Sequence, residues 1–193
     1  MRRSNEGQPI DVVDGMLETH RQEERVTEEV ATLAHDYGRL VFNAAYRVLG
    51  DATLAEDVQQ DVFLKLVEEH RGKVNSWPAY LVASAVRGAI DQLRHQKRWG
   101  RLMRLWAGQQ IDTAASAEQV GIASERGQRL RAALANLPRR EAQCFSLRYL
   151  ENLDISEIAQ ALALSENNIN VTLHRARRRL ETQLGDPSPE ATR

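Results

Sequence analysis

Amide and arginine side chains gather on one segment near the C-terminal end of the chain, residues 165–180. The apolar members of this segment are Ile169, Leu173, Ala176 and Leu180. Their steps of four, three and four residues place them on one face of a helix. The other faces carry Asn167, Asn170, His174, Arg175, Arg178 and Arg179. Amides can bond base edges and arginines can neutralise phosphates, so the pattern is typical of a DNA-reading helix; a solvated basic surface helix is the alternative.

A short helix and a tight turn are predicted directly before this segment. Asp154 and Glu157 have the spacing of a capping box, in which each side chain accepts a hydrogen bond from the other residue's backbone. A turn at residues 163–164 leads to Ser165, whose hydroxyl can cap the next helix. A short helix, a turn and a second helix with a basic exposed side form the helix-turn-helix pattern of DNA-binding proteins.

Charge is distributed unevenly along a chain whose net charge is only −1. Residues 51–69 carry six acidic residues and one lysine, whereas residues 77–107 carry six basic residues and one acid. Basic segments fit nucleic acid, and an acidic segment fits a basic protein surface. At least two kinds of partner are therefore expected.

The apolar periodicity predicts an all-α protein made of two small helical domains joined by a flexible linker. A three-helix bundle is expected over residues 26–99, with its first helix beginning at Thr27, and a four-helix domain over residues 125–184. Residues 100–124 are predicted as the linker, although Leu102, Met103, Leu105 and Trp106 are apolar enough to dock on the bundle or on a partner. Residues 1–25 are predicted as a weakly ordered extension and residues 185–193 as a disordered tail.

Several classes of protein are disfavoured by what the sequence contains. The single cysteine, Cys144, permits no internal disulfide, suits a small buried residue and favours a cytoplasmic location. The five histidines show no metal-ligand spacing, and no phosphate-binding glycine loop or nucleophile–base pair is recognised. We therefore expect no enzyme activity, no metal, no cofactor and no small-molecule substrate. The apolar runs are too short to span a membrane, and the N-terminus lacks a secretory signal.

Two ordered sets of motifs resemble a known family. The first set consists of the stretch 50–64 (Gly-Asp-Ala-Thr-Leu-Ala-Glu-Asp-Val-Gln-Gln-Asp-Val-Phe-Leu), Trp-Pro-Ala-Tyr-Leu at 77–81 and Ala-Ile-Asp-Gln-Leu-Arg at 89–94. The second consists of Leu-Pro-Arg-Arg-Glu at 137–141, Leu-Arg-Tyr-Leu at 147–150, Ile-Ser-Glu-Ile-Ala at 155–159 and Leu-His-Arg-Ala-Arg-Arg-Arg-Leu at 173–180. These sets resemble regions two and four of bacterial sigma factors. A chain with only these two regions is similar to an extracytoplasmic-function (ECF) RNA polymerase sigma factor.

The resemblance implies a transcription initiation factor that binds RNA polymerase core and recognises the −10 and −35 promoter elements. It implies that the acidic second helix docks on the β′ clamp coiled coil, with the β subunit as a further contact, through Asp57, Gln60, Asp61 and Phe63. It implies that the basic third helix and the preceding loop hold the melted −10 strand through Lys73, Asn75, Ser76, Arg87, Arg94, Lys97 and Arg98. The candidates for the −35 duplex are Arg148, Asn167, Asn170, Val171, Arg175 and Arg178.

The chain departs from the family pattern at two of these places. Gly88 stands where many members carry an asparagine after the arginine aligned with Arg87, which puts a transferred base contact in doubt and costs about 1 kcal/mol of helix propensity. Asn170 stands where members often carry a basic residue, so a different promoter preference is expected. The family also implies control by an anti-sigma factor, often membrane-tethered, which would hold the protein at the inner membrane.

Two other functions fit part of the sequence. A helix-turn-helix activator of the response-regulator type would need an α/β sensor domain, and the N-terminal half shows no such strands. A helical adaptor without a nucleic-acid role would not need asparagines and arginines on the exposed side of the last helix.

Overall fold

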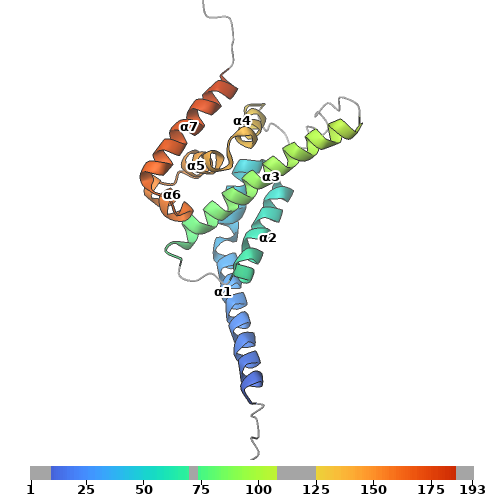
Figure 1. The fold of residues 1–193 in the computed structure, drawn as a ribbon, viewed down its shortest axis with the longest axis vertical. Coiled ribbons are helices and arrows are strands. Elements are labelled where there is room, and N and C mark those ends of the chain that lie inside the picture. Colours follow the sequence, from blue (N-terminus) through green and yellow to red (C-terminus); the bar gives the residue numbers. More distant parts are fainter. Residues whose placement is uncertain (1–9, 70–73, 108–124, 186–193) are drawn as a thin grey trace, which may run out of the picture.

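Helices are the only regular elements in the parts of the chain that the computed structural model describes, residues 10–69, 74–107 and 125–185. They are α1 (Ile10–Leu49), α2 (Ala52–Glu69), α3 (Trp77–Ala107), α4 (Glu125–Asn136), α5 (Arg139–Tyr149), α6 (Ile155–Leu162) and α7 (Glu166–Leu184) (Figure 1). The predicted all-α class is confirmed, with three helices in the first half and four in the second. No helix within these ranges is both long enough and apolar enough to cross a bilayer.

The first three helices pack around a core of small and branched apolar side chains. Val41 and Val48 of α1, and Leu81 and Ile90 of α3, are completely buried. The turn between α1 and α2 is made by Gly50, which has a φ of +66°, a backbone conformation that suits glycine. Asp51 then caps α2, because its carboxylate accepts a hydrogen bond from the Leu54 amide at 3.0 Å.

In the second half of the molecule, α6 and α7 begin at the caps that the sequence predicts. The Asp154 amide donates to the Glu157 carboxylate at 2.8 Å, which completes the capping box at the start of α6. Ala163 ends α6 in the left-handed conformation, with a φ of +52°. Ser165 then caps α7 by accepting from the Asn168 amide at 3.3 Å. These caps fix the angle between the two helices of the helix-turn-helix.

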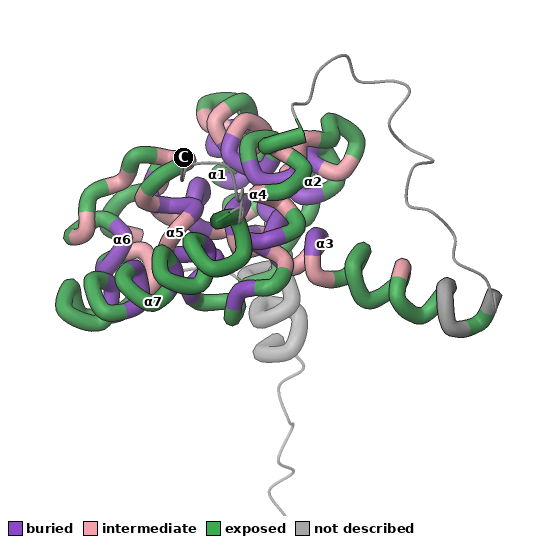
Figure 2. Tube along the Cα trace, turned by 90° about the horizontal axis from the view of Figure 1, so that it is seen from above, coloured by how far each residue is buried: buried purple, intermediate pink, exposed green. Residues whose placement is uncertain are grey.

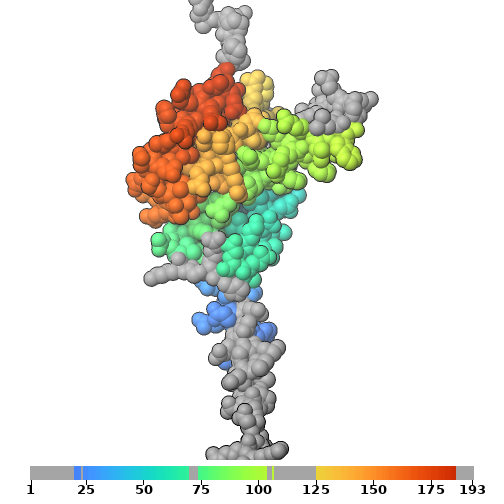
Figure 3. Space-filling model, viewed as in Figure 1, coloured from blue at the N-terminus to red at the C-terminus, as the bar shows by residue number. Residues whose placement is uncertain are grey.

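The two halves of the molecule pack against each other along α3. This helix contacts α1 and α2 on one side and α4, α5 and α6 on the other. In Figure 2, α5, α6 and α7 gather on the left and the free end of α3 projects to the right, and the space-filling view in Figure 3 shows the surfaces of the two halves joined without a gap. Two separate sequence domains therefore form one continuous body.

Two boundaries predicted from the sequence are wrong. Helix α1 begins at Ile10 and not at Thr27, and α3 continues to Ala107 through the first part of the predicted linker. Starting a helix fixes several residues for its first hydrogen bond, whereas extending it fixes one residue for each added bond. Good helix formers can therefore prolong an existing helix even where it packs against nothing. Both extensions project from the body (Figure 1). The rest of the predicted linker and most of the predicted tail lie outside the described residues.

Candidate nucleic-acid interface

The start of α7 separates packing residues from candidate reading residues. Ile169 is completely buried, whereas Asn167 and Asn170 are exposed and Val171 is 41% exposed. This is the division that the apolar periodicity predicts. Asn168, which the sequence did not single out, is engaged locally, because its backbone donates to Ser165 and its side chain accepts from the Thr172 hydroxyl at 3.3 Å.

The arginines of α7 divide in the same way. Arg175 and Arg178 are exposed and line an open groove that also includes Arg179, Thr182 and Gln183. The Arg179 guanidinium turns back toward α5, where its Nε lies 3.3 Å from the Glu141 carboxylate, whose side chain is 9% exposed. Arg179 therefore anchors α7, while Arg175 and Arg178 present positive charge outward.

Arg148 of α5 is half-buried beside the first helix of the helix-turn-helix. Its Nη1 donates to the Leu153 carbonyl at 2.8 Å and lies 3.3 Å from an Asp154 carboxylate oxygen. Two bonds from one guanidinium brace the loop that leads into α6. The sequence predicts a DNA-backbone contact here, and the structure adds this local bracing of the loop.

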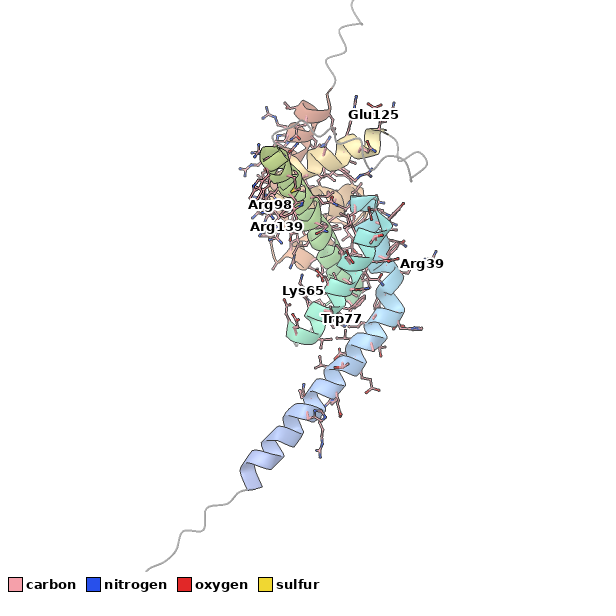
Figure 4. The ribbon with its side chains drawn as sticks, turned by 90° about the vertical axis from the view of Figure 1, so that its right-hand side faces the viewer. Arg39, Lys65, Trp77, Arg98, Glu125 and Arg139 are labelled. Atoms are coloured by element: carbon pink, nitrogen blue, oxygen red, sulfur yellow. The ribbon has the colours of Figure 1, made fainter. Side chains whose placement is uncertain are left out.

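The candidate residues for a melted strand lie along α3 and just before it. Asn75 and Ser76 are exposed ahead of α3, whose first turn is fixed by the edge-on contact of Trp77 and Tyr80, with ring centroids 6.0 Å apart. Arg98 is exposed on the basic half of α3, where Figure 4 labels it. Lys73 lies outside the described residues.

Two of the remaining basic candidates on α3, Arg94 and Lys97, contact the second half of the molecule. Arg87 is half-buried. The Arg94 guanidinium donates to the Leu137 backbone carbonyl at 2.8 Å, and the Lys97 ammonium bonds the Asn136 side chain. The sequence gives no sign of these contacts, because they join residues about forty positions apart.

Gly88 lies where α3 comes closest to α2. A Cβ built at this position would lie 3.0 Å from Cγ1 of Val58, closer than almost any real contact of this kind. The position therefore points into the packing between the two helices. The absence of the asparagine that many family members carry has a steric reason here.

The acidic face of α2 borders an apolar groove. Asp57, Gln60 and Asp61 are exposed, as predicted, and Phe63 is half-buried. The groove has a volume of about 550 Å³ and is lined by Thr27, Val30, Ala31, Ala34, Glu56, Gln59, Gln60, Phe63, Leu64 and Val67. The part of the groove formed by α1 and by Leu64, which is 60% exposed, was not predicted from the sequence. Leu64 could have indicated the groove, because it is an apolar residue that lies outside the periodic buried face of α2.

The projecting end of α3 carries exposed apolar side chains. Trp99 and Trp106 are 57% and 82% exposed, and Leu102 and Met103 are also exposed. These four side chains do not dock on the bundle, and docking on a partner, the other expected outcome, stays a prediction. The Leu105 side chain lies outside the described residues. Trp99 stacks on His95, with ring centroids 6.5 Å apart.

Neither metal binding nor thiol chemistry is indicated in the described part of the chain. No group of three or more His, Cys, Asp or Glu residues is placed there to hold a metal ion. The Cys144 thiol is completely buried, as predicted, and burial raises its pKa to about 11. A thiol so protonated is unreactive at neutral pH.

Comparison with known proteins matches both halves to one family. Residues 33–98 match the Sigma-70 region 2 model and residues 127–180 match the Sigma-70 region 4 model. The ECF RNA polymerase sigma factor SigK of Mycobacterium ulcerans is 26% identical over 148 residues, 75% of this chain and 79% of SigK. The ECF RNA polymerase sigma factor SigW of Bacillus subtilis is 24% identical over 169 residues, 81% of this chain and 89% of SigW.

A solved structure has a similar fold. It is CnrH in complex with the cytosolic domain of CnrY, with a TM-score of 0.54 and 19% sequence identity, covering 88% of this chain and 96% of CnrH.

Proposed function

This chain belongs to the extracytoplasmic-function sigma factors, and we propose that it directs core RNA polymerase to promoters by recognising the −10 and −35 elements. The observation that carries the proposal is the presence of both sigma-70 regions in order, each with an exposed face of the required chemistry. A response-regulator-type activator is disfavoured because the described N-terminal half consists of helices. A helical adaptor would not need the exposed amides and arginines of α7.

The −35 element is the proposed target of α7. A recognition helix places the residues of its N-terminal turns against base edges in the major groove. Asn167, Asn170 and Val171 occupy those turns and are exposed. Asn can bond both edge groups of an adenine, and an exposed valine can contact a thymine methyl group. Arg175 and Arg178 follow on the outer face, where they bond phosphates or a guanine.

The −10 element is the proposed target of α3 and the loop before it. To keep a melted strand apart from its complement, a protein must bind the strand's phosphate backbone with basic side chains. It must also surround the unstacked bases with polar groups. The loop residues Lys73, Asn75 and Ser76 surround the base in this proposal. The backbone is held by the basic residues of α3, namely Arg87, Arg94, Lys97 and Arg98.

Core polymerase is the proposed partner of the α1–α2 groove. Its floor accepts apolar side chains, and Asp57 and Asp61 on its border attract a basic surface such as that proposed for the β′ clamp coiled coil. The β subunit is proposed as the further contact. We expect Asp57→Lys with Asp61→Lys to reduce affinity for core polymerase at least tenfold by charge repulsion. The matched control is Glu29→Lys with Asp36→Lys, two exposed acids seven residues apart on one face of α1 and outside the groove lining. Affinity is measured by fluorescence titration, and equal losses in both variants would contradict the assignment.

An anti-sigma factor is the proposed regulator. Such a protein would cover the groove or the DNA-binding faces in the cytoplasm, and one with a membrane anchor would hold the complex at the inner membrane. CnrH, the structural neighbour, was solved with the cytosolic domain of CnrY.

Reconstituted transcription tests the proposed function. Purified protein and core polymerase are incubated with fragmented genomic DNA, and transcript 5′ ends are sequenced. Starts that need the protein and share two upstream motifs are expected. The Asn167→Ala, Asn170→Ala variant separates promoter recognition from core binding, because it should still bind core polymerase and yet lose those starts. Identical transcripts with core alone would refute the proposal.

A further inference from the structure

The end of α3 that projects from the body carries an exposed apolar stripe. Trp99, Leu102, Met103 and Trp106 follow at steps of three, one and three residues, which places them on one side of the helix. Their exposed fractions range from 42% to 82%. Figure 2 shows this end of α3 standing clear of the other helices. An exposed apolar stripe of this kind is a candidate interaction surface.

The stripe does not continue the face that α3 buries. Leu93 is the last buried residue of α3 among those that the structure describes. The same face continues four and seven residues later, where Lys97 and Gly100 stand. Lys97 bonds Asn136 of α4, so this face is turned toward the body. The apolar stripe is turned away from it, where the core of the protein cannot cover it.

The charge around the stripe is entirely positive. Residues 92–107 contain five lysines and arginines and no acidic residue. Arg98 and Arg101 are exposed. Arg98 precedes Leu102 by four residues and therefore borders the stripe, whereas Arg101 lies on the polar side. An arginine at the border of an apolar face can keep its aliphatic part in an apolar phase and its guanidinium in a polar layer.

This combination fits the surface of an anionic membrane. Helices that lie in the membrane interface carry lysine and arginine on one side and tryptophan and leucine on the other. Tryptophan prefers this interface, because its ring is apolar and its N–H group is polar. Trp99 and Trp106 are about 10 Å apart along the helix axis, so both can anchor one helix lying along the surface. The positive charge complements acidic phospholipid headgroups.

A single-stranded nucleic acid fits the same surface less well. Such a strand is held where aromatic rings stack on bases and neighbouring basic side chains bind the phosphates. Here the aliphatic side chains of Leu102 and Met103 lie between the two tryptophans, and Arg101 lies on the other side of the helix. Aliphatic side chains are stabilised by entering hydrocarbon, which favours the membrane as the occupant.

We propose that the projecting end of α3 is an interfacial helix that binds membranes rich in anionic phospholipids. The apolar stripe enters the boundary between headgroups and acyl chains, and Arg98 and Arg101 lie among the headgroups. The proposal goes beyond promoter recognition and does not rest on it. It gives the protein a contact with the membrane surface that needs no membrane-tethered partner.

Binding of the full-length protein to lipid vesicles tests the proposal. The vesicles contain phosphatidylglycerol mixed with phosphatidylcholine, or phosphatidylcholine alone, and bound protein is measured by sedimentation. We expect binding at least about tenfold tighter to the anionic vesicles, and this binding should weaken as salt is added. Tryptophan emission should move to shorter wavelength, because Trp99 and Trp106 leave water. No binding to the anionic vesicles, or equal binding to both kinds, would overturn the proposal.

Two pairs of variants locate the contact on α3. Leu102→Gln should weaken binding to anionic vesicles at least about fivefold, because it places a polar group in the stripe. Its matched control is Leu184→Gln on α7, since Leu184 is 39% exposed and Leu102 is 42% exposed. Arg101→Glu should weaken binding more than Arg177→Glu, which makes the same charge change at an exposed position of α7. Thermal unfolding establishes that the variants fold, and equal binding within both pairs would overturn the assignment to α3.

The same emission measurement tests other occupants of the stripe. The protein is made with hydroxytryptophan in place of tryptophan, so that it can be excited apart from the tryptophans of polymerase. It is titrated with core polymerase and with a single-stranded oligonucleotide, and it is also diluted alone. A shift with polymerase or the oligonucleotide but none with anionic vesicles would overturn the proposal. A shift to longer wavelength on dilution alone would show that a second copy of the chain covers the stripe, and it would overturn the proposal as well.

Discussion

Asn170 is the proposed reading residue at which we expect promoter choice to differ from that of relatives with a basic residue there. It is exposed about one turn into α7, beside Val171, and the core residue Ile169 fixes its direction. An amide prefers adenine, whereas an arginine prefers guanine. The −35 sequence that this protein selects should therefore carry an adenine where relatives with a basic residue select a guanine.

Replacement of Asn170 tests that preference. Asn170→Arg should lose about 1–3 kcal/mol of binding to the native −35 duplex and should gain affinity when one adenine is changed to guanine. Binding of the full chain with core polymerase to duplexes varied at each position measures this. His174→Arg, an exposed change on the same helix, is the control for added charge. A uniform change across all duplexes would assign Asn170 to the backbone instead.

Glu151 makes the contact between the two regions sensitive to pH. Burial is the largest effect and raises the pKa of this carboxyl, although the charge and hydrogen bond of Arg47 oppose the shift. A carboxyl with a raised pKa binds its proton more readily when folded. Its contribution to stability is therefore greatest below pH 4.5 and declines as the pH rises through the interval above that value.

Glu151→Gln should remove this decline. The difference in unfolding free energy between parent and variant, measured by urea unfolding at several pH values, should change with pH only from about 4.5 upward. Glu181→Gln, which alters an exposed acid on α7, serves as the comparison. A difference that grows in favour of the parent as the pH rises would show that Arg47 dominates.

At the scale of the helices, the packing of α2 on α3 explains Gly88. A Cβ at Gly88 would lie 3.0 Å from Val58, so a side chain there requires Val58 to shift; the low helix propensity of glycine is offset by the close packing. Gly88→Asn should destabilise the protein by about 1–3 kcal/mol. Val58→Ala should reduce the size of that effect in a double-mutant cycle, because it removes the obstructing methyl groups. Chemical unfolding of the parent, the two single variants and the double variant measures the cost of Gly88→Asn with and without the Val58 methyl groups. Additive effects would mean that Gly88 and Val58 do not interact.

Helix order, caps and the exposed polar face of α7 could be predicted because each depends on neighbouring residues. The Asp154–Glu157 box and the Ser165 cap are local hydrogen bonds, and the buried stripe of α7 follows from its spacing. Contacts such as Arg94 with Leu137 depend on where distant segments meet, and the sequence carries no period that encodes them. The length of α1 was missed for a related reason, because polar helix formers extend a helix without marking a buried face.

At the scale of the whole molecule, the N-terminal part of α1 stands away from both regions (Figure 1). Among the side chains that the structure describes, burial in α1 begins at Val30, and the earlier pair of His20 and Glu24, 3.3 Å apart, is exposed. Exposed pairs of this kind contribute little to stability. Deletion of residues 1–25 should therefore change the unfolding free energy by less than about 1 kcal/mol.

Two measurements on the shortened chain separate a structural role from an interaction role. Urea unfolding should give nearly the parent midpoint, because the deleted residues precede the core. Core-dependent transcription should also be retained if the extension serves neither polymerase nor DNA. Retained stability with lost transcription would make the extension a docking arm, whereas a large fall in the unfolding midpoint would show that residues 10–25 of α1 support the three-helix core from a distance.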